Sequence, residues 1–173
     1  GDWCPFCQAH LRELDGPFRE RLEQAGGRLV GVTSQSAEAA SGAREQWGLR
    51  YELVSDPDNE LATRFEASIT PKAETPLAEH PTEYPHGMAQ PAVVALDSSG
   101  RVLYRWAIVP SQSNLGGASD RPLPDELWTA IEAARGGGAA PTPGAERLDP
   151  AYLEARYPEL HERFRAWVAS QSS

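Results

Sequence analysis

The sequence predicts an α/β fold in which a sheet is flanked by helices, and three observations support this class. The chain of 173 residues is long enough to bury a full core without disulfide or metal support. Apolar residues make up 40% of it and charged residues 24%, which excludes a fibrous or wholly disordered protein. In the first third, helical spacing of apolar residues alternates with short apolar runs, a pattern typical of parallel strands joined by helices.

The first helix is expected to begin at Cys4. Apolar positions recur from there at spacings of three and four, namely Cys4, Cys7, Leu11, Leu14, Phe18 and Leu22. Pro17 interrupts this face, because it lacks an N–H and clashes with the carbonyl of the preceding turn. The segment therefore predicts a kink or two consecutive helices, the second of which stops at Gly26 and Gly27.

Two short strands, with a helix between them, are expected next. Residues 29–32 and 51–54 are apolar runs of strand length. Ser36 is suited to cap the intervening helix and Gly48 to end it. The inward side of that helix is expected to consist of Ala40, Ala43 and Trp47.

A further helix is predicted next, with Asp56 as its N-cap residue and Pro57 in its first turn. Leu61 and Phe65 are expected to lie inward on this helix. Residues 68–90 then interrupt the alternation of helices and strands, because their prolines disfavour regular structure. These prolines are Pro71, Pro76, Pro81 and Pro85.

A β-hairpin is expected over residues 92–106, at the edge of the sheet, with its turn at 97–100. Its first strand is continuously apolar, and its second strand alternates between apolar and polar residues. Beyond the hairpin, the sequence predicts a polar loop over 111–121 and a helix over 123–134.

The composition divides the chain into a domain over residues 1–135, a Gly- and Pro-rich linker over 136–147 and an amphipathic helical tail over 148–173. One stripe of the tail consists of Leu153, Tyr157, Leu160, Phe164 and Trp167. Burying each such side chain contributes roughly 1.5–3 kcal/mol, so the stripe should dock on a surface. We expect the tail to pack on its own domain; the alternative is a groove on a second copy, which would make a homodimer.

The only two cysteines, Cys4 and Cys7, are the candidate site. A helix N-terminus offers unpaired N–H donors and partial positive charge, which stabilise a thiolate. A second thiol three residues on can resolve a mixed disulfide. Pro5 fits the first helical turn, and Trp3 can shield the pair. We therefore expect a redox pair whose sulfurs lie close enough to form an intramolecular disulfide.

Other interpretations of the cysteines stay open at this point. They could be a stray pair of buried thiols, or half of a zinc site. Zinc needs two more ligands, which His80 and His86 could supply, although their spacing in a proline-rich loop is not a usual pattern. His10, three residues after Cys7, could tune the thiol, but a lone helical histidine is more often a solvated surface group. No metal is expected.

The Trp-Cys-Pro-Phe-Cys run of residues 3–7 resembles the redox motif of thioredoxin-fold proteins. Other segments resemble the peroxiredoxin branch of that fold, namely residues 32–36, 53–58, 61–65, 93–97 and 100–102. The resemblance covers roughly residues 1–135 and is nearest to the peroxiredoxin-like group named alkyl hydroperoxide reductase/thiol-specific antioxidant (AhpC/TSA, or redoxin). It implies a thioredoxin-like fold with a central mixed sheet, and an antioxidant thiol-dependent oxidoreductase that needs no cofactor.

The resemblance also implies roles for single residues. Cys7 matches the peroxidatic cysteine, and Cys4 occupies the position where peroxiredoxins have Thr or Ser. Arg121 is the best positional match for the arginine that stabilises the thiolate and orients peroxide; taken alone, it could equally be a solvent-exposed loop arginine. Gln90 and Pro91 resemble the cis-proline junction of thioredoxin folds, so a cis bond packed against the cysteines is expected.

The family has a strand directly before the cysteine motif, in the middle of the sheet. Residues 1–173 contain no counterpart of this strand. We therefore expect its slot in the sheet to be empty or to be filled by another element.

Three functions remain compatible with these residues. In a peroxidase, the Cys7 thiolate attacks the peroxide and Cys4 resolves the product. In a disulfide reductase, Cys4 attacks first, and its place near the helix end predicts that Cys4 is the more exposed sulfur. A binding module that kept the fold without turnover is the third. The expected partners are a peroxide or disulfide substrate and a reductant, either a thioredoxin-like protein or a low-molecular-weight thiol.

Composition disfavours several other classes. A net charge of −9 repels phosphate backbones, so no nucleic-acid partner is expected. No apolar run approaches the roughly 18 residues of a membrane span. Neither a GxGxxG nor a P-loop pattern occurs, so no nucleotide cofactor is expected. No signal peptide follows Gly1, so a cytoplasmic location is expected.

Overall fold

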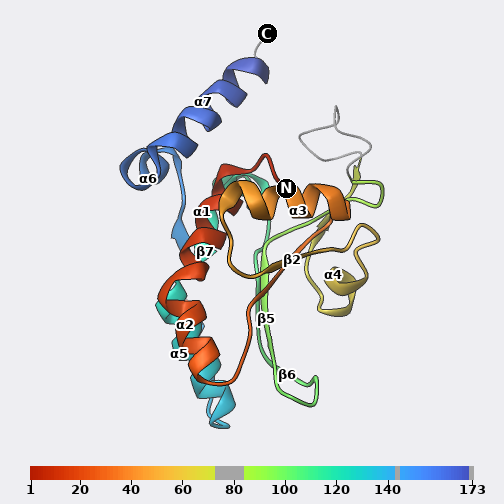
Figure 1. Ribbon diagram of the computed structural model, residues 1–173, viewed down its shortest axis with the longest axis vertical. Helices are drawn as coiled ribbons and strands as arrows, with labels where there is room; N and C mark the ends of the chain where they lie inside the picture. The colour runs from red at the N-terminus through yellow and green to blue at the C-terminus, as the bar shows by residue number, and fades with distance from the viewer. Residues whose placement is uncertain (73–83, 143–144, 172–173) are drawn as a thin grey trace.

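The computed structural model describes residues 1–72, 84–142 and 145–171, which form a mixed α/β structure (Figure 1). The helices are α1 (Pro5–Glu13), the π-helical turn η1 (Leu14–Phe18), α2 (Arg19–Gln24), α3 (Ala37–Trp47), α4 (Glu60–Arg64), the 3-10 helix η3 (Gln112–Gly117), α5 (Pro124–Arg135), α6 (Pro150–Arg156) and α7 (Pro158–Gln171). The strands are β1 (Val30–Thr33), β2 (Glu52–Ser55), β3 (Ile69–Thr70), β4 (Met88–Ala89), β5 (Ala92–Leu96), β6 (Val102–Ala107), β7 (Asp120–Pro122) and β8 (Ala145–Arg147). In Figure 1, α1, α2 and α5 lie on one side of β5 and β6, and α4 lies on the other.

The first helical face is interrupted where Pro17 predicts a break. Gly16 leaves the helical region, with φ −88° and ψ −135°, so the π-helical turn η1 separates α1 from α2. After α2, Gly26 takes a positive φ of 79° and ends the segment. The prediction of two consecutive helices that stop at the Gly pair is confirmed.

The strands pair two by two. β1 and β2 are parallel, with Val30 opposite Glu52, and β5 and β6 form an antiparallel hairpin, with Ala92 opposite Ala107. The predicted parallel pair and hairpin are thus confirmed. Within the described residues, however, each sheet contains two strands, and no strand pairs with both β1 and β5. The position of the family's strand before the cysteine motif is therefore not occupied by a described strand.

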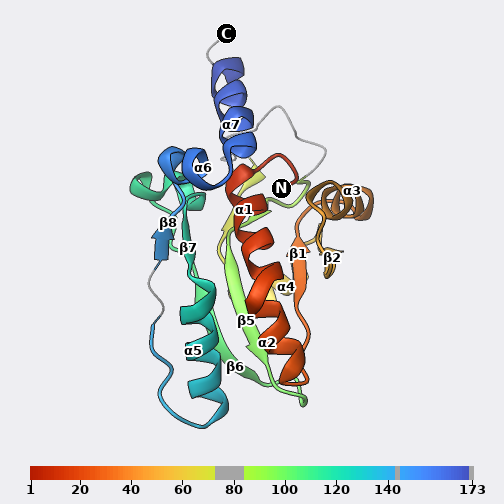
Figure 2. The ribbon, with the colours of Figure 1, turned by 60° about the vertical axis from the view of Figure 1, so that its left-hand side comes forward.

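Helix α1 connects the two strand pairs in place of a continuous sheet. Leu11, on α1, packs against the buried cluster around Trp47 and Tyr51, which lies beside β1 and β2. It also packs against a second buried cluster, which includes Tyr104 on β6 and Leu127 on α5. In Figure 2, α1 and α2 run in front of the interval between β1 and β5. The helix that carries the cysteines is therefore held by both halves of the core.

The helix after β2 begins later than predicted. Its N-cap is Asn59, in the left-handed region with φ 56°, and Pro57 lies outside the helix. The carboxylate of Asp56 still accepts hydrogen bonds from the first three N–H groups of α4, at 2.9–3.2 Å. Leu61 is 36% exposed, so its predicted inward orientation is wrong.

Short strands lie in segments that were expected to be irregular. β3 and β4 pair at the two ends of the proline-rich range 68–90, of which Pro76 and Pro81 lie outside the described residues. β7 begins in the expected loop 111–121, and β8 falls in the expected linker 136–147. These two strands pair antiparallel, so β8 holds β7, the strand that carries the candidate site residue Arg121. Such pairings join distant residues, so the local pattern did not predict them.

The tail packs on the beginning of its own chain, as expected. Helices α6 and α7 lie against the N-terminal end of α1 in Figures 1 and 2. Leu153 and Leu160 are fully buried there, in a cluster that includes Phe6. An ion pair of 2.7 Å between Arg12 and Glu159 lies at the margin of this contact. The homodimer stays a prediction. No helix of the described ranges is long and apolar enough to cross a membrane.

Candidate functional site

The two cysteines lie at the start of α1, as the sequence predicts. Cys4 is the N-cap residue, with φ −80° and ψ 110°, and its Sγ accepts a hydrogen bond from the Cys7 N–H at 3.3 Å. Pro5 occupies the first turn, where a missing N–H costs no helical hydrogen bond. The two sulfurs are 2.7 Å apart and both thiols are free. The pair is therefore placed for exchange between dithiol and disulfide.

The relative exposure of the two cysteines is the reverse of the prediction. Cys4 is buried, with 4% of its surface exposed, whereas Cys7 is partly exposed. The expectation that Cys4 is the more accessible sulfur is wrong. The reason is non-local: Cys4 belongs to the buried cluster that contains Leu148, Leu153 and Leu160, so the tail covers the end of the helix.

Arg121 lies beside Cys7, on strand β7. It is 2% exposed, so the alternative of a solvent-exposed loop arginine is wrong. Its Nη1 donates to the carbonyls of Gly117 and Asp120, at 3.1 and 2.8 Å, and its Nη2 lies 3.7 Å from the Cys7 Sγ. Among the described residues, the acceptors of this buried guanidinium are thus two neutral carbonyls and one sulfur. A buried cation is costly without a counter-ion, which a Cys7 thiolate provides.

The pKa values of the two thiols are shifted in opposite directions. The hydrogen bond between the two sulfurs lowers the pKa of the Cys7 thiol well below its usual value, and the Arg121 charge acts in the same direction against the effect of burial. The same sulfur–sulfur hydrogen bond, together with burial, raises the pKa of Cys4. The favoured state of the pair is therefore a Cys7 thiolate that accepts a hydrogen bond from a Cys4 thiol.

His10 is buried beside this site and is not the solvated surface group that the sequence favoured. It is 7% exposed, and its Nε2 has no hydrogen-bond partner in the described part of the chain. Burial, and then the Arg121 charge, lower its pKa to about 3, although a hydrogen bond to the Pro122 backbone acts in the opposite direction. His10 is therefore a neutral neighbour of the arginine at physiological pH. Because His10 follows Cys7 by three residues, the sequence already placed the two on the same face of the helix.

We expect His10 to make the fold sensitive to acid. Its folded-state pKa of about 3 lies below the usual histidine value of 6.5, so between these values the unfolded chain binds a proton that the folded chain does not. Stability should fall as pH decreases from 6.5 toward 3, by up to about 1.4 kcal/mol per pH unit from this group. Urea unfolding of the wild type and His10→Asn at several pH values measures the difference. Parallel stability curves for the two proteins would contradict the prediction.

The cis isomer predicted for the Gln90–Pro91 bond is wrong. No cis peptide bond occurs in the described residues, and this bond is among them. The junction joins β4 directly to β5, and it is held extended on both sides: the Gln90 N–H donates to Ser68 O at 2.7 Å, and the Pro91 carbonyl accepts from Ile108 at 3.0 Å. Contact between Pro91 and the cysteines stays a prediction.

The Gln90 side chain braces the loop that leads to Arg121. Its Nε2 donates to Thr70 Oγ1 at 2.7 Å, and the side chain is buried. Gly117 has a φ of +98°, and a Cβ at this position would lie 2.4 Å from Gln90 Oε1. Only glycine allows this close approach, and the carbonyl of the same glycine holds the Arg121 guanidinium.

Aromatic side chains surround the other side of the motif. The Trp3 Nε1 donates to the Tyr84 hydroxyl at 2.9 Å, and the Trp3 ring stacks on Trp167 with 6.3 Å between centroids. Phe6, within the motif, meets the edge of Phe164 at 5.3 Å. Trp3 therefore packs, together with residues of the tail, against the cluster that includes Cys4.

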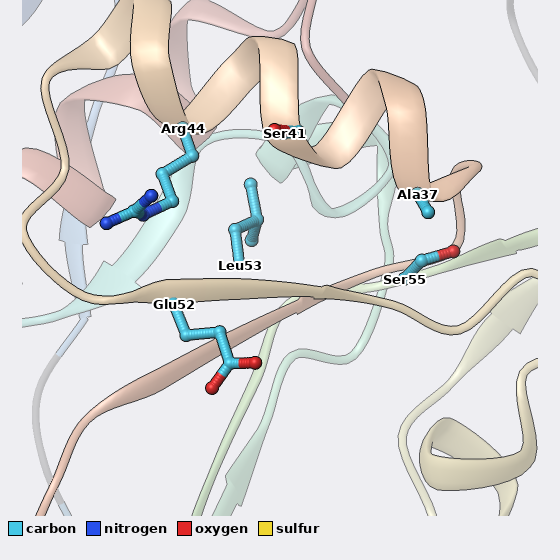
Figure 3. A pocket seen from close by; sticks show the side chains of 6 residues that line it. All are labelled: Ala37, Ser41, Arg44, Glu52, Leu53 and Ser55. Carbon is cyan, nitrogen blue, oxygen red and sulfur yellow. The ribbon is translucent and has the colours of Figure 1, made fainter.

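The metal alternative finds no support in the described residues, where no group of three or more His, Cys, Asp or Glu side chains could hold an ion. His80 lies outside these residues, and His86 lies 3.2 Å from Asp58 at the surface. A separate open hollow lies between α3 and β2 (Figure 3). Its lining consists of Ala37, Ser41, Arg44, Glu52, Leu53 and Ser55 and includes neither cysteine.

A parallel strand pair, a β-hairpin and a Cys-x-x-Cys at a helix N-terminus are features expected of a thiol-dependent redox protein with a thioredoxin-like fold. A model of the AhpC/TSA family matches residues 1–105, more than half of the chain, so the chain belongs to this family. Members of the family are generally thiol peroxidase oxidoreductases. Arg121 lies outside the matched residues. A comparison with curated proteins and one with solved structures give no match.

Proposed function

We propose that this protein is a thiol peroxidase in which Cys7 reacts with the peroxide and Cys4 resolves the product. The observation that carries the proposal is the contact of 3.7 Å between the buried Arg121 guanidinium and the Cys7 sulfur. An arginine in this place favours the thiolate form of Cys7 and leaves Cys4 protonated. Because Cys7 is also the more exposed residue of the pair, a small oxidant reaches the activated thiol first.

The reaction consists of two steps. The Cys7 thiolate attacks one peroxide oxygen, the O–O bond breaks, and the leaving alkoxide or hydroxide takes a proton, which gives a sulfenic acid and an alcohol or water. The Cys4 thiol then forms a bond to the Cys7 sulfur and expels water. Since the sulfurs start 2.7 Å apart, the second step needs little movement of the helix. Two equivalents of an external thiol return the disulfide to the dithiol.

Arg121 is the proposed catalytic partner of Cys7. Two carbonyl acceptors and the pairing of β7 with β8 fix its guanidinium, so its Nη2 is oriented before any peroxide binds. A preorganised cation at this point stabilises negative charge on the sulfur and on the departing oxygen. The neutral His10 beside it adds no competing positive charge at pH 7.

Disulfide reduction is the second candidate, and one contact favours it. The Cys7 N–H donates to the Cys4 sulfur at 3.3 Å, the arrangement that stabilises a thiolate on the first cysteine of a helix N-terminus. However, Cys4 is 4% exposed, and a disulfide needs an open approach to the attacking sulfur. A peroxide at Cys7 requires no such opening, so the geometry favours peroxidase activity.

Stopped-flow mixing of the reduced protein with hydrogen peroxide tests the proposal, with mass spectrometry of quenched samples. We expect one equivalent of peroxide to be consumed and the mass to fall by two hydrogens as the disulfide forms. A parallel reaction with oxidised insulin, a protein disulfide, measures the second candidate. Fast reduction of insulin without reaction of peroxide would overturn the peroxidase assignment. No reaction with either substrate would favour a binding module.

A further inference from the structure

Helix α7 covers the cysteine motif with its aromatic residues, while deeper residues of the tail anchor it. Leu153 and Leu160 are fully buried and hold the tail on α1. Phe164 and Trp167 come later on α7, are only partly buried, and pack on Phe6 and Trp3, which flank the cysteines. The side chains that hold the tail on α1 are therefore different from those that cover the cysteine motif.

Polar contacts fix the covering part of α7 in register with the motif. Arg163, next to Phe164, donates through Nη1 to Gln8 Oε1 at 2.6 Å, and its Nη2 reaches Asp2 O at 3.5 Å. Gln8 follows Cys7 directly and is buried. These contacts reach residues on both sides of the cysteine pair in the sequence, so α7 is positioned over the motif itself.

We infer that Phe164 and Trp167 determine the size of molecule that reaches the cysteine pair. With α7 in place, Cys4 is enclosed and Cys7 stays partly exposed, so a small peroxide meets Cys7 while a bulky disulfide is kept from Cys4. This inference rests on the proposed peroxidase function and deepens it, because it assigns the discrimination by size to two side chains of the tail.

The same cover selects the reductant. In the oxidised pair, an external thiolate must attack one sulfur, form a mixed disulfide with it and expel the other as a thiolate. Cys7 is the more exposed residue of the pair, so the mixed disulfide forms there and Cys4 leaves. A second external thiol then releases Cys7 and carries away a disulfide of the two reductant molecules. A low-molecular-weight thiol fits this approach, whereas a protein reductant requires α7 to move away.

Alkylation of Cys4 in a Cys7→Ser background tests the cover without using peroxide. The probes are iodoacetamide and a maleimide coupled to polyethylene glycol of 5 kDa. Both react with the thiolate, so the ratio of their rate constants at one pH reports access and not the thiol pKa. Substituting Phe164→Ala and Trp167→Ala together should raise the ratio of the maleimide rate constant to the iodoacetamide rate constant at least about tenfold. The reason is that the free energy needed to move α7 away from the motif falls by RT ln 10 or more.

Val168→Ala is the matched control, since Val168 lies next to Trp167 on the exposed side of α7 and is 43% exposed. It should leave the ratio unchanged. Trp167→Ala alone keeps the buried leucine anchors and should give a smaller rise, which guards against a double variant that does not fold. A ratio that is the same in all these proteins would overturn the inference. Failure of the wild type to react with peroxide would instead overturn the proposed function and leave the alkylation result standing.

Discussion

Cys7→Ser should abolish peroxide reduction, with a loss in rate on the order of 10⁴-fold or more, as expected when a catalytic nucleophile is removed. The hydroxyl that replaces the thiol is not ionised by a neighbouring arginine, so Arg121 has no anion to stabilise. Stopped-flow consumption of hydrogen peroxide by the reduced variant measures this effect. A binding module would instead show the same slow background reaction in the wild type and the variant.

Cys4→Ser is the matched variant, because it removes the other sulfur of the pair. It should still consume one equivalent of peroxide, but the sulfenic acid at Cys7 should persist and turnover with an external thiol should slow. Mass spectrometry after trapping with dimedone detects this intermediate. The opposite pattern, in which Cys4→Ser abolishes the first oxidation and Cys7→Ser retains it, would assign the attack to Cys4.

Arg121→Met should slow the reaction with peroxide by about 10²–10³-fold at pH 7, the range for loss of one preorganised donor at a reacting charge. Its guanidinium lies 3.7 Å from the Cys7 sulfur and favours the thiolate. Without it, the pKa of Cys7 should rise, so part of the loss should be recovered as pH increases through the new value. Methionine keeps a side chain of similar length in the buried site.

The pH dependence of iodoacetamide reaction and of peroxide reaction separates these two effects of Arg121. Arg105→Met is a suitable control, since Arg105 is a surface residue that contacts Glu66 and no cysteine. Thermal unfolding of both variants shows whether the buried position tolerates the change. If Arg121→Met is folded and reacts with peroxide at the wild-type rate over the whole pH range, Arg121 has no part in the chemistry.

Features that depend on neighbouring residues in the chain were predictable from the sequence. Ser36 caps α3 through Ala39 N–H, and Gly48 ends that helix with a φ of 67°. Pro17 produces the break in the first helical segment, and Pro5 lies in its first turn. In each case the residue type itself restricts φ or supplies a local hydrogen bond, so a single sequence contains the cause.

Features that depend on distant contacts were not predictable in this way. Cys4 is buried by contact with the distant tail, and Arg121 lies on a strand whose partner, β8, is distant in the sequence. His10 is buried for a related reason, because its neighbours Arg121 and Pro122 come from the same distant strand. The cis isomer expected at Gln90 came from the family resemblance, and hydrogen bonds to two separate segments hold the extended form instead.

The contact between α1 and α7 also bears on how the protein folds. The hydrogen bonds from Arg12 to Glu159 and from Arg163 to Gln8 join residues 147 and 155 positions apart. A ribosome adding roughly 5–20 residues per second needs on the order of ten seconds to make the chain between them. During that interval the nascent cysteine pair has no α7 above it, and it is open to oxidation or to mixed disulfides with other thiols. The cover of this redox site is therefore completed only late in the synthesis of the chain.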